Sequence, residues 1–162
     1  MKALITTLLL IAFASPSFAL SCLRPDPIET FERLAAAEET YFVIYGQLTF
    51  DEDALPQGVN SFEQTEDPDP IPAWFDGLGL SRVGFVTPYR SHVQLQVTCA
   101  GPWCGSARNG GQAVYFVPAT DSPVTLQAGP CGGMIFDDPA PAVLDMLTSC
   151  MQGGSCEPLP FE

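Results

Sequence analysis

The chain has 162 residues, 46% of them hydrophobic, and 19 acidic side chains against six basic ones give it a formal charge of −13. This hydrophobic content suffices for a packed core and excludes global disorder. The excess of acid excludes nucleic acid as a partner, because a phosphate backbone requires a basic face, and it disfavours an anionic membrane surface for the same reason.

The first 19 residues have the pattern of a signal peptide. Lys2 supplies the positive start, an apolar run follows over 3–13, and Ser17-Phe18-Ala19 is a small-x-small cleavage site. The run is too short to span a bilayer, and no later stretch has the length and apolar character of a transmembrane helix. We expect 1–19 to be removed and 20–162 to form a single domain in the periplasm or outside the cell.

Six cysteines follow this leader: Cys22, Cys99, Cys104, Cys131, Cys150 and Cys156. An even number in an exported chain predicts three disulfide bonds in an oxidising compartment. A lipid on Cys22 is one alternative, but it would leave five cysteines, and Ala19 stands where a lipoprotein signal usually has a large aliphatic residue. The other alternative is a zinc ion held by the cysteine pairs at 99–104 and 150–156. It conflicts with export, because cysteines form disulfides in the exported compartment. We therefore expect no metal and no cofactor.

A helix is predicted from Asp26 onward. Asp26 is a capping residue, Pro27 suits the first turn, and Glu29 completes a capping-box pattern. Apolar side chains then recur at helical spacing: Ile28, Phe31 and Leu34. The next segment, "TYFVIYGQLTF" at 40–50, is rich in β-branched and aromatic residues and predicts a strand.

The region from Asp51 to about Leu80 is predicted to be a loop. It is acidic, above all over 51–76, and proline-rich, with "EDPDPIP" at its centre. A loop of this length in a compact domain is either functional or mobile. One or two strands are then predicted over 81–99, because apolar side chains alternate on one face of the segment: Val93, Leu95 and Val97.

The last third of the chain predicts two more strands and a helix. Asn109-Gly110-Gly111 is a hairpin turn signal before a strand, and "SPVTLQAGPC" at 122–131 is a further strand. "DDPAPAVLDMLTSC" has a cap-and-proline helix start, followed by one apolar helical face: Val143, Leu147 and Cys150. The order of helix, several antiparallel strands and helix favours a small barrel or sandwich.

His92 is the only histidine, so any Ser-His-Asp or Cys-His catalytic device would have to use it. No G-x-S-x-G motif is present, and the cysteines are expected to be oxidised. We therefore place His92 at the polar start of a strand and expect no enzymatic activity.

The acidic loop invites a calcium interpretation. An EF-hand loop starting at Asp51 requires Gly and Glu at the places held by Pro56 and Phe62, so that motif fails. A second acidic cluster follows: Glu63, Glu66, Asp67 and Asp69. Solvated loop charge is the simpler interpretation of both clusters, with weak calcium binding as the alternative.

The same second cluster is the candidate for a carboxylate-dependent hydrolase. A chain with 19 acidic residues contains pairs of neighbouring carboxylates whatever its function, so the presence of such a pair alone is no evidence for a hydrolase. Sugar binding would also use exposed aromatics, and the chain offers Trp74, Trp103 and Tyr89. Core packing accounts for these three equally well.

Several segments, taken in order, resemble the tissue inhibitors of metalloproteinases. They are "CLRPDPIETF" at 22–31, the strand "YFVIYGQLTF", "WCGSA" at 103–107, "GGQAVYFVPA", and "VTLQAGPCGG" ending the match at Gly133. The resemblance implies a netrin-like OB-fold, a mainly β domain in which a five-stranded Greek-key barrel has flanking helices. It also implies a bond between Cys22 and Cys131. In that framework the place of a further amino-terminal cysteine is held here by Leu20, so Cys104 is expected to pair with nearby Cys99, and Cys150 with Cys156.

The resemblance bears on function through the amino terminus. Family inhibitors place their free terminal amine on a protease zinc ion, and the following residue fills the specificity pocket. Here Leu20 and Ser21 would take these roles, but without the disulfide that holds the family's terminus rigid, chelation loses preorganisation. We therefore expect a secreted or periplasmic, non-catalytic module that binds a protein or glycan partner. Metalloproteinase inhibition through Leu20 and Ser21 is the first alternative, and the hydrolase is the second.

Overall fold

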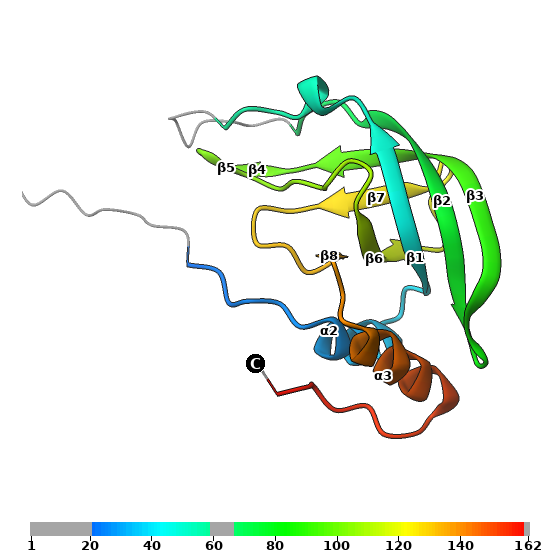
Figure 1. Cartoon of the computed structure of the whole chain (residues 1–162). Helices are drawn as coiled ribbons and strands as arrows, with labels where there is room; N and C mark the ends of the chain where they lie inside the picture. Colours follow the sequence, from blue (N-terminus) through cyan, green and yellow to red (C-terminus); the bar gives the residue numbers. More distant parts are fainter. Residues whose placement is uncertain (1–20, 59–66, 161–162) are drawn as a thin grey trace, which may run out of the picture.

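The computed structural model describes residues 21–58 and 67–160; the predicted signal peptide, Leu20, the loop segment 59–66 and 161–162 lie outside them. The described chain is mainly β. A six-stranded mixed sheet curls into a half-barrel, a two-stranded ribbon extends from it, and two helices pack together at one end (Figure 1). The elements are α2 (Pro27–Ala35), β1 (Tyr41–Phe50), the 3-10 turn η2 (Glu52–Ala54), β2 (Ile71–Ser81), β3 (Gly84–Val97), β4 (Cys99–Ala100), β5 (Trp103–Cys104), β6 (Gln112–Pro118), β7 (Thr125–Ala128), β8 (Ile135–Asp137) and α3 (Pro141–Gln152).

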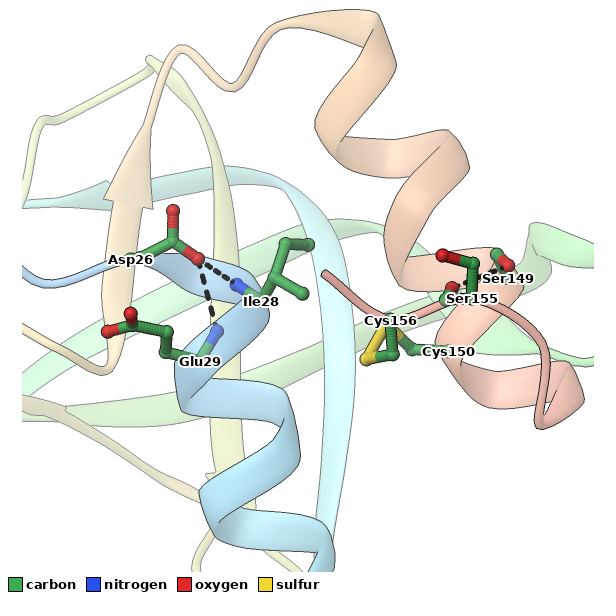
Figure 2. Close-up of a disulfide and its surroundings, with 7 residues drawn as sticks. All are labelled: Asp26, Ile28, Glu29, Ser149, Cys150, Ser155 and Cys156. Atoms are coloured by element: carbon green, nitrogen blue, oxygen red, sulfur yellow. Dashed lines mark hydrogen bonds between the residues drawn. A yellow bond between two sulfur atoms is a disulfide. The ribbon is translucent and has the colours of Figure 1, made fainter. Parts of the chain in front are cut away.

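Helix α2 begins where the capping pattern predicts. The Asp26 carboxylate accepts hydrogen bonds from the backbone N–H of Ile28 at 2.7 Å and of Glu29 at 3.1 Å (Figure 2). These bonds satisfy two of the amides that the first turn of a helix leaves without partners. Ile28 and Leu34 are buried, as their spacing predicts.

Helix α3 differs from the prediction at its start. The two aspartates before Pro139 do not cap it; the capping position is Ala140, which makes no side-chain cap bond. Pro141 lies in the first turn, so the cap falls beyond both aspartates. The predicted apolar face is confirmed, because Leu147 and Cys150 are buried and Val143 packs beside them.

The sheet has the order β7-β3-β2-β1-β6-β8. β1 pairs antiparallel with β2 and with β6, and β2 and β3 form a long antiparallel hairpin. The expectation of antiparallel strands is wrong at one edge, where β7 runs parallel to β3 and pairs Leu126 with Leu95. The reason is the chain path. After β6 the chain crosses to the far edge of the sheet, and β7 there also contacts β6, which brings the two sides of the curl together.

Two glycines allow β1 and β2 to approach closely where the sheet curls. Gly46 and Gly77 are register partners, and a Cβ built on Gly77 would lie 2.7 Å from the Cα of Gly46. The ring of Phe75 covers the same place, 2.9 Å from that Cβ position. Any side chain at Gly77 would therefore have to displace both the backbone of the neighbouring strand and a core phenylalanine.

The barrel core lies inside the curl and is formed by alternate residues of the strands. Its largest fully buried side chains are Ile44, Leu48, Phe75, Leu95, Tyr115 and Leu126. A second apolar cluster lies on the other side of the sheet, where α2 and α3 cover β1 and β6. It joins Val43, Val114 and Phe116 of the sheet to Ile28 and Leu147 of the helices.

The structure has three disulfide bonds, and they join the pairs expected above. Cys22–Cys131 ties the amino-terminal segment to the chain that follows β7, across 109 positions of sequence. Cys99–Cys104 closes the β4–β5 ribbon, and Cys150–Cys156 returns the tail to α3, where the Ser149 hydroxyl also donates to the Ser155 carbonyl at 2.7 Å (Figure 2).

All six cysteines are therefore paired, which leaves no thiolate for zinc and no thiol on Cys22 for a lipid. Three disulfides in a chain of this size indicate an oxidising, exported environment. Over residues 21–58 and 67–160, the structure contains no helix with the length and apolar character to cross a membrane.

The predicted loop from Asp51 to about Leu80 is too long by a whole strand. β2 begins at Ile71, inside the acidic part 51–76, and η2 forms a short turn soon after β1. The prolines and aspartates around it are typical of loops, so the sequence pattern did not indicate this strand. Pro72 is nevertheless tolerated, because it is the second residue of β2 and lies beyond the last pair with β1, which joins Phe50 to Ala73. Its side chain is exposed, and Ile71, Ala73 and Phe75 alternate with it into the core.

Candidate binding face

The outer face of the sheet, on the side away from the barrel core, has two halves of different character. Apolar side chains of one half pack against the helices: Tyr41, Val43, Tyr45, Val114 and Phe116. Figure 1 shows both helices at the end of the sheet where β1 begins. The half near the end of β1 carries polar side chains and one tryptophan, which we call the polar outer face: Gln47, Thr49, Trp74, Asp76, Arg90, His92, Gln94, Thr125 and Gln127.

The first row of this face crosses three strands, where Thr49 pairs with Trp74 and Trp74 with His92. The indole of Trp74 and the imidazole of His92 meet edge to face, with ring centroids 4.8 Å apart and planes at 68°. Trp74 is 39% exposed, whereas its strand neighbour Phe75 is completely buried. The row therefore presents a large aromatic ring to solvent in an orientation that a neighbouring ring helps to fix.

The second row runs parallel to the first, where Gln47 pairs with Asp76 and Asp76 with Arg90. The Nε of Arg90 donates to the Asp76 carboxylate at 2.8 Å. This hydrogen bond, with the carboxylate's charge, raises the pKa of the Arg90 guanidinium. Both side chains are at least half exposed, so the pair adds little to stability and its remaining donors and acceptors face solvent.

Two loops border the face on the side of β7. The end of the β1–β2 connection is attached to β3 by the Gln96 side chain, whose Nε2 donates to the Pro68 carbonyl at 2.9 Å. Near the start of that connection, Gly58 packs directly against the backbone of Pro102 in the turn between β4 and β5. The β1–β2 connection is thus held to β3 and to the disulfide-closed ribbon.

Of the two residues predicted for the inhibitor terminus, the structure describes only Ser21. Leu20 lies outside the described residues, and Ser21 is exposed beside the disulfide-bonded Cys22. Leu23 follows with 93% of its surface exposed. Cys104, which a family inhibitor would bond to its terminus, instead pairs with Cys99.

The predicted acidic cluster is described only in part. Glu63 and Glu66 lie outside the described residues, whereas Asp67 and Asp69 are exposed just before β2. Across residues 21–58 and 67–160, His, Cys, Asp and Glu side chains form no group of three or more placed to hold a metal ion.

The structure separates the three aromatics that the sequence left undecided. Tyr89 packs inward against Phe42 and Phe75, with ring centroids 5.7 and 5.8 Å away. Trp74 lies on the polar outer face, and Trp103 is 37% exposed on β5. Only the two tryptophans are therefore available to a ligand.

The placement of His92 at the start of a strand is wrong. His92 lies well inside β3, because that strand begins at Gly84. It is the residue that pairs with Trp74 across the β2–β3 hairpin. It is exposed and contacts Trp74. Sequence reasoning missed the polar outer face because the assumed loop concealed β2. The available signal was the alternation of Pro72, Trp74 and Asp76 with apolar residues.

Two grooves lie away from this face. One, of about 660 Å³, is bordered by the amino-terminal segment, β8, the start of α3 and the tail, and the other, of about 270 Å³, lies between α2 and β1. Asp137 lines the larger groove. Burial raises the pKa of its carboxyl group, Arg108 lowers it, and Asp138 raises it further.

A comparison of the chain with protein-family models, curated proteins and solved structures found no match. The fold and the face together define a mainly β, disulfide-bonded protein with a half-barrel sheet. Its outer surface offers one aromatic platform surrounded by amides, hydroxyls and a charge-balanced ion pair.

Proposed function

We propose that this chain is an exported, non-catalytic binding module with a netrin-like OB-fold, and that it recognises a protein or glycan partner on the polar outer face. The strand order supports the OB-fold assignment. β1, β2 and β3 follow one another as a meander, β7 runs parallel to β3, and β6 returns to β1. This arrangement is the one expected of a five-stranded, partly open Greek-key barrel built from these strands.

The position of Trp74 is the observation that carries the binding proposal. OB-folds use the face of their second and third strands, with the adjoining loops, to bind ligands. Trp74 and His92 lie on β2 and β3. Trp74 lies on the side of the sheet away from the barrel core and keeps 39% of its surface exposed, and a large aromatic ring on an exposed surface is a typical anchor for a partner.

Photo-crosslinking in the native host tests this proposal. A photoreactive phenylalanine analogue placed at Thr49, beside Trp74, should capture a partner, and a Trp74→Ala change should abolish the adduct. The matched control is the same analogue at Val83, which is 76% exposed at the tip of the β2–β3 hairpin. Equal yields from the two positions, or an adduct that survives Trp74→Ala, would overturn the assignment of the face.

Metalloproteinase inhibition through Leu20 and Ser21 is the second candidate. It is favoured by the Cys22–Cys131 bond, which anchors the segment one residue after Ser21, and by the exposure of Ser21 and Leu23. On this mechanism, one extra residue before Leu20 removes inhibition of a zinc metalloproteinase, because the terminal amine no longer reaches the metal. Inhibition of unchanged potency in the extended protein would exclude it.

A further inference from the structure

We infer that the partner of the polar outer face is a neutral oligosaccharide, whose sugar rings stack on Trp74. This inference rests on the proposed function, which assigns the face to binding, and adds the chemical class of the ligand. Three properties of the face carry it: the presentation of the indole, the kind of polar groups around it, and their charge.

The presentation of the indole suits a flat ligand. Trp74 stands on an antiparallel sheet between two polar neighbours, Thr49 and His92, and no large apolar side chain adjoins it in its row. An interface core for a protein partner is formed by several apolar side chains together. A pyranose ring instead needs a single aromatic surface for its C–H groups, with polar groups at its rim for the hydroxyls.

The surrounding groups suit hydroxyls. Gln47 offers both an acceptor and two donors, Thr49 a hydroxyl, and the Asp76–Arg90 pair holds a carboxylate and a guanidinium in fixed relation. A sugar hydroxyl both donates and accepts, so it can bind to each of these groups. The two rows span about 10 Å across β1, β2 and β3 at the usual strand spacing, which accommodates a short chain of sugars.

The charge of the face favours a ligand without net charge. Asp76 and Arg90 neutralise each other within the face, while the whole chain carries −13. A polyanion is repelled by the molecule as a whole. A neutral ligand is the class that the face favours.

The test is binding of the disulfide-bonded protein to an array of neutral and anionic oligosaccharides, followed by calorimetry with the neutral glycans selected. We expect saturable binding of at least one neutral glycan. Trp74→Ala should weaken it at least tenfold, and Arg90→Gln several-fold. Val83→Ser, an exposed apolar change outside the face, should leave the affinity unaltered.

Two results would overturn the inference. One is that no neutral glycan binds, and the other is that a glycan binds equally well to the Trp74→Ala protein. The crosslinking from Thr49 separates these failures from failure of the proposed function. A protein adduct at Thr49 that depends on Trp74, without glycan binding, would exclude an oligosaccharide as the ligand. It would still support the polar outer face as the binding site. If there is neither a Trp74-dependent adduct nor glycan binding, both the oligosaccharide inference and the proposed binding function are excluded.

Discussion

The indole of Trp74 lies 4.8 Å from the imidazole of His92, ring centroid to ring centroid, and this aromatic pair is on the surface of the sheet. The next residue, Phe75, points the opposite way and contacts Tyr115 in the barrel core at 5.5 Å. Adjacent residues of β2 thus lie on opposite faces of the sheet, because side chains alternate between the two faces of a strand. Phe75 stabilises the fold, and Trp74 is available to a partner.

Because Phe75 and Trp74 lie on opposite faces, truncating each to alanine should lower the free energy of unfolding by different amounts. Phe75→Ala should lower the free energy of unfolding by about 3–5 kcal/mol, since it empties a fully buried position. Trp74→Ala should cost less, about 1–2 kcal/mol, because the side chain is already partly exposed and loses its packing on the sheet surface together with the edge-to-face contact to His92. Urea unfolding of both variants measures the difference. A loss for Trp74→Ala as large as that for Phe75→Ala would show that the indole is a structural residue.

The close approach of β1 and β2 predicts a sharp contrast between two glycines of the same strand. Gly77→Ala should destabilise by about 1–3 kcal/mol or more, because its methyl group would overlap the backbone of Gly46 and the ring of Phe75. Gly79→Ala is the control, since its Cβ would have no neighbour closer than 3.7 Å. Thermal unfolding of the two variants decides the matter. Equal melting temperatures would contradict the close approach of β1 and β2 at Gly46 and Gly77.

The disulfides Cys22–Cys131 and Cys99–Cys104 should differ in their effect on stability. On the chain-entropy model, removing Cys22–Cys131 by a double serine change costs about 4–5 kcal/mol, because the bond closes a loop of more than a hundred residues. Removing Cys99–Cys104 should cost only about 2 kcal/mol on the same model, since it closes a short loop. Denaturant unfolding of both double variants, with the other bonds intact, gives the comparison. The reverse order would indicate that the amino-terminal bond is peripheral.

The raised pKa of Asp137 predicts how the free energy of unfolding changes with pH. Burial is the main cause that raises its pKa in the folded protein above the unfolded value of about 3.9. Below the unfolded pKa the carboxyl is protonated in both states and costs nothing. As the pH rises through the folded pKa, the folded state must ionise a partly desolvated acid, so stability falls.

Asp137→Asn should therefore stabilise the protein at about pH 7 and have a smaller effect at about pH 3, where the acid is protonated in both states. Urea midpoints of the two proteins at both pH values measure this. A variant that is less stable than the parent at the higher pH would mean that attraction to Arg108 outweighs burial, contrary to the order of causes given above.

The sequence predicted the local features of the fold well. The capping residue Asp26, the apolar face of α3 and the strand at 40–50 each depend on neighbours in sequence, which is why pattern alone located them. The disulfide between Cys22 and Cys131 came from a family resemblance, because no local pattern relates two cysteines so far apart.

The polar outer face was not predictable in the same way. It depends on the register of the β2–β3 hairpin, which places Trp74 opposite His92 and Asp76 opposite Arg90. That register includes an irregularity between Gly79 and Leu80, and a shift of one residue would bring different side chains together. The parallel pairing of β7 was missed for a related reason, since strand direction follows from the path of the whole chain.

The most direct measurement is acrylamide quenching of Trp74 fluorescence in a Trp103→Phe variant, where Trp74 is the only tryptophan of the chain. The ligand is the glycan selected on the array or the partner captured at Thr49. Our account predicts that saturating ligand protects Trp74 and lowers its quenching constant, because the partner covers the part of Trp74 that solvent now reaches. A ligand that binds with the same affinity while quenching of Trp74 stays unchanged would contradict the account.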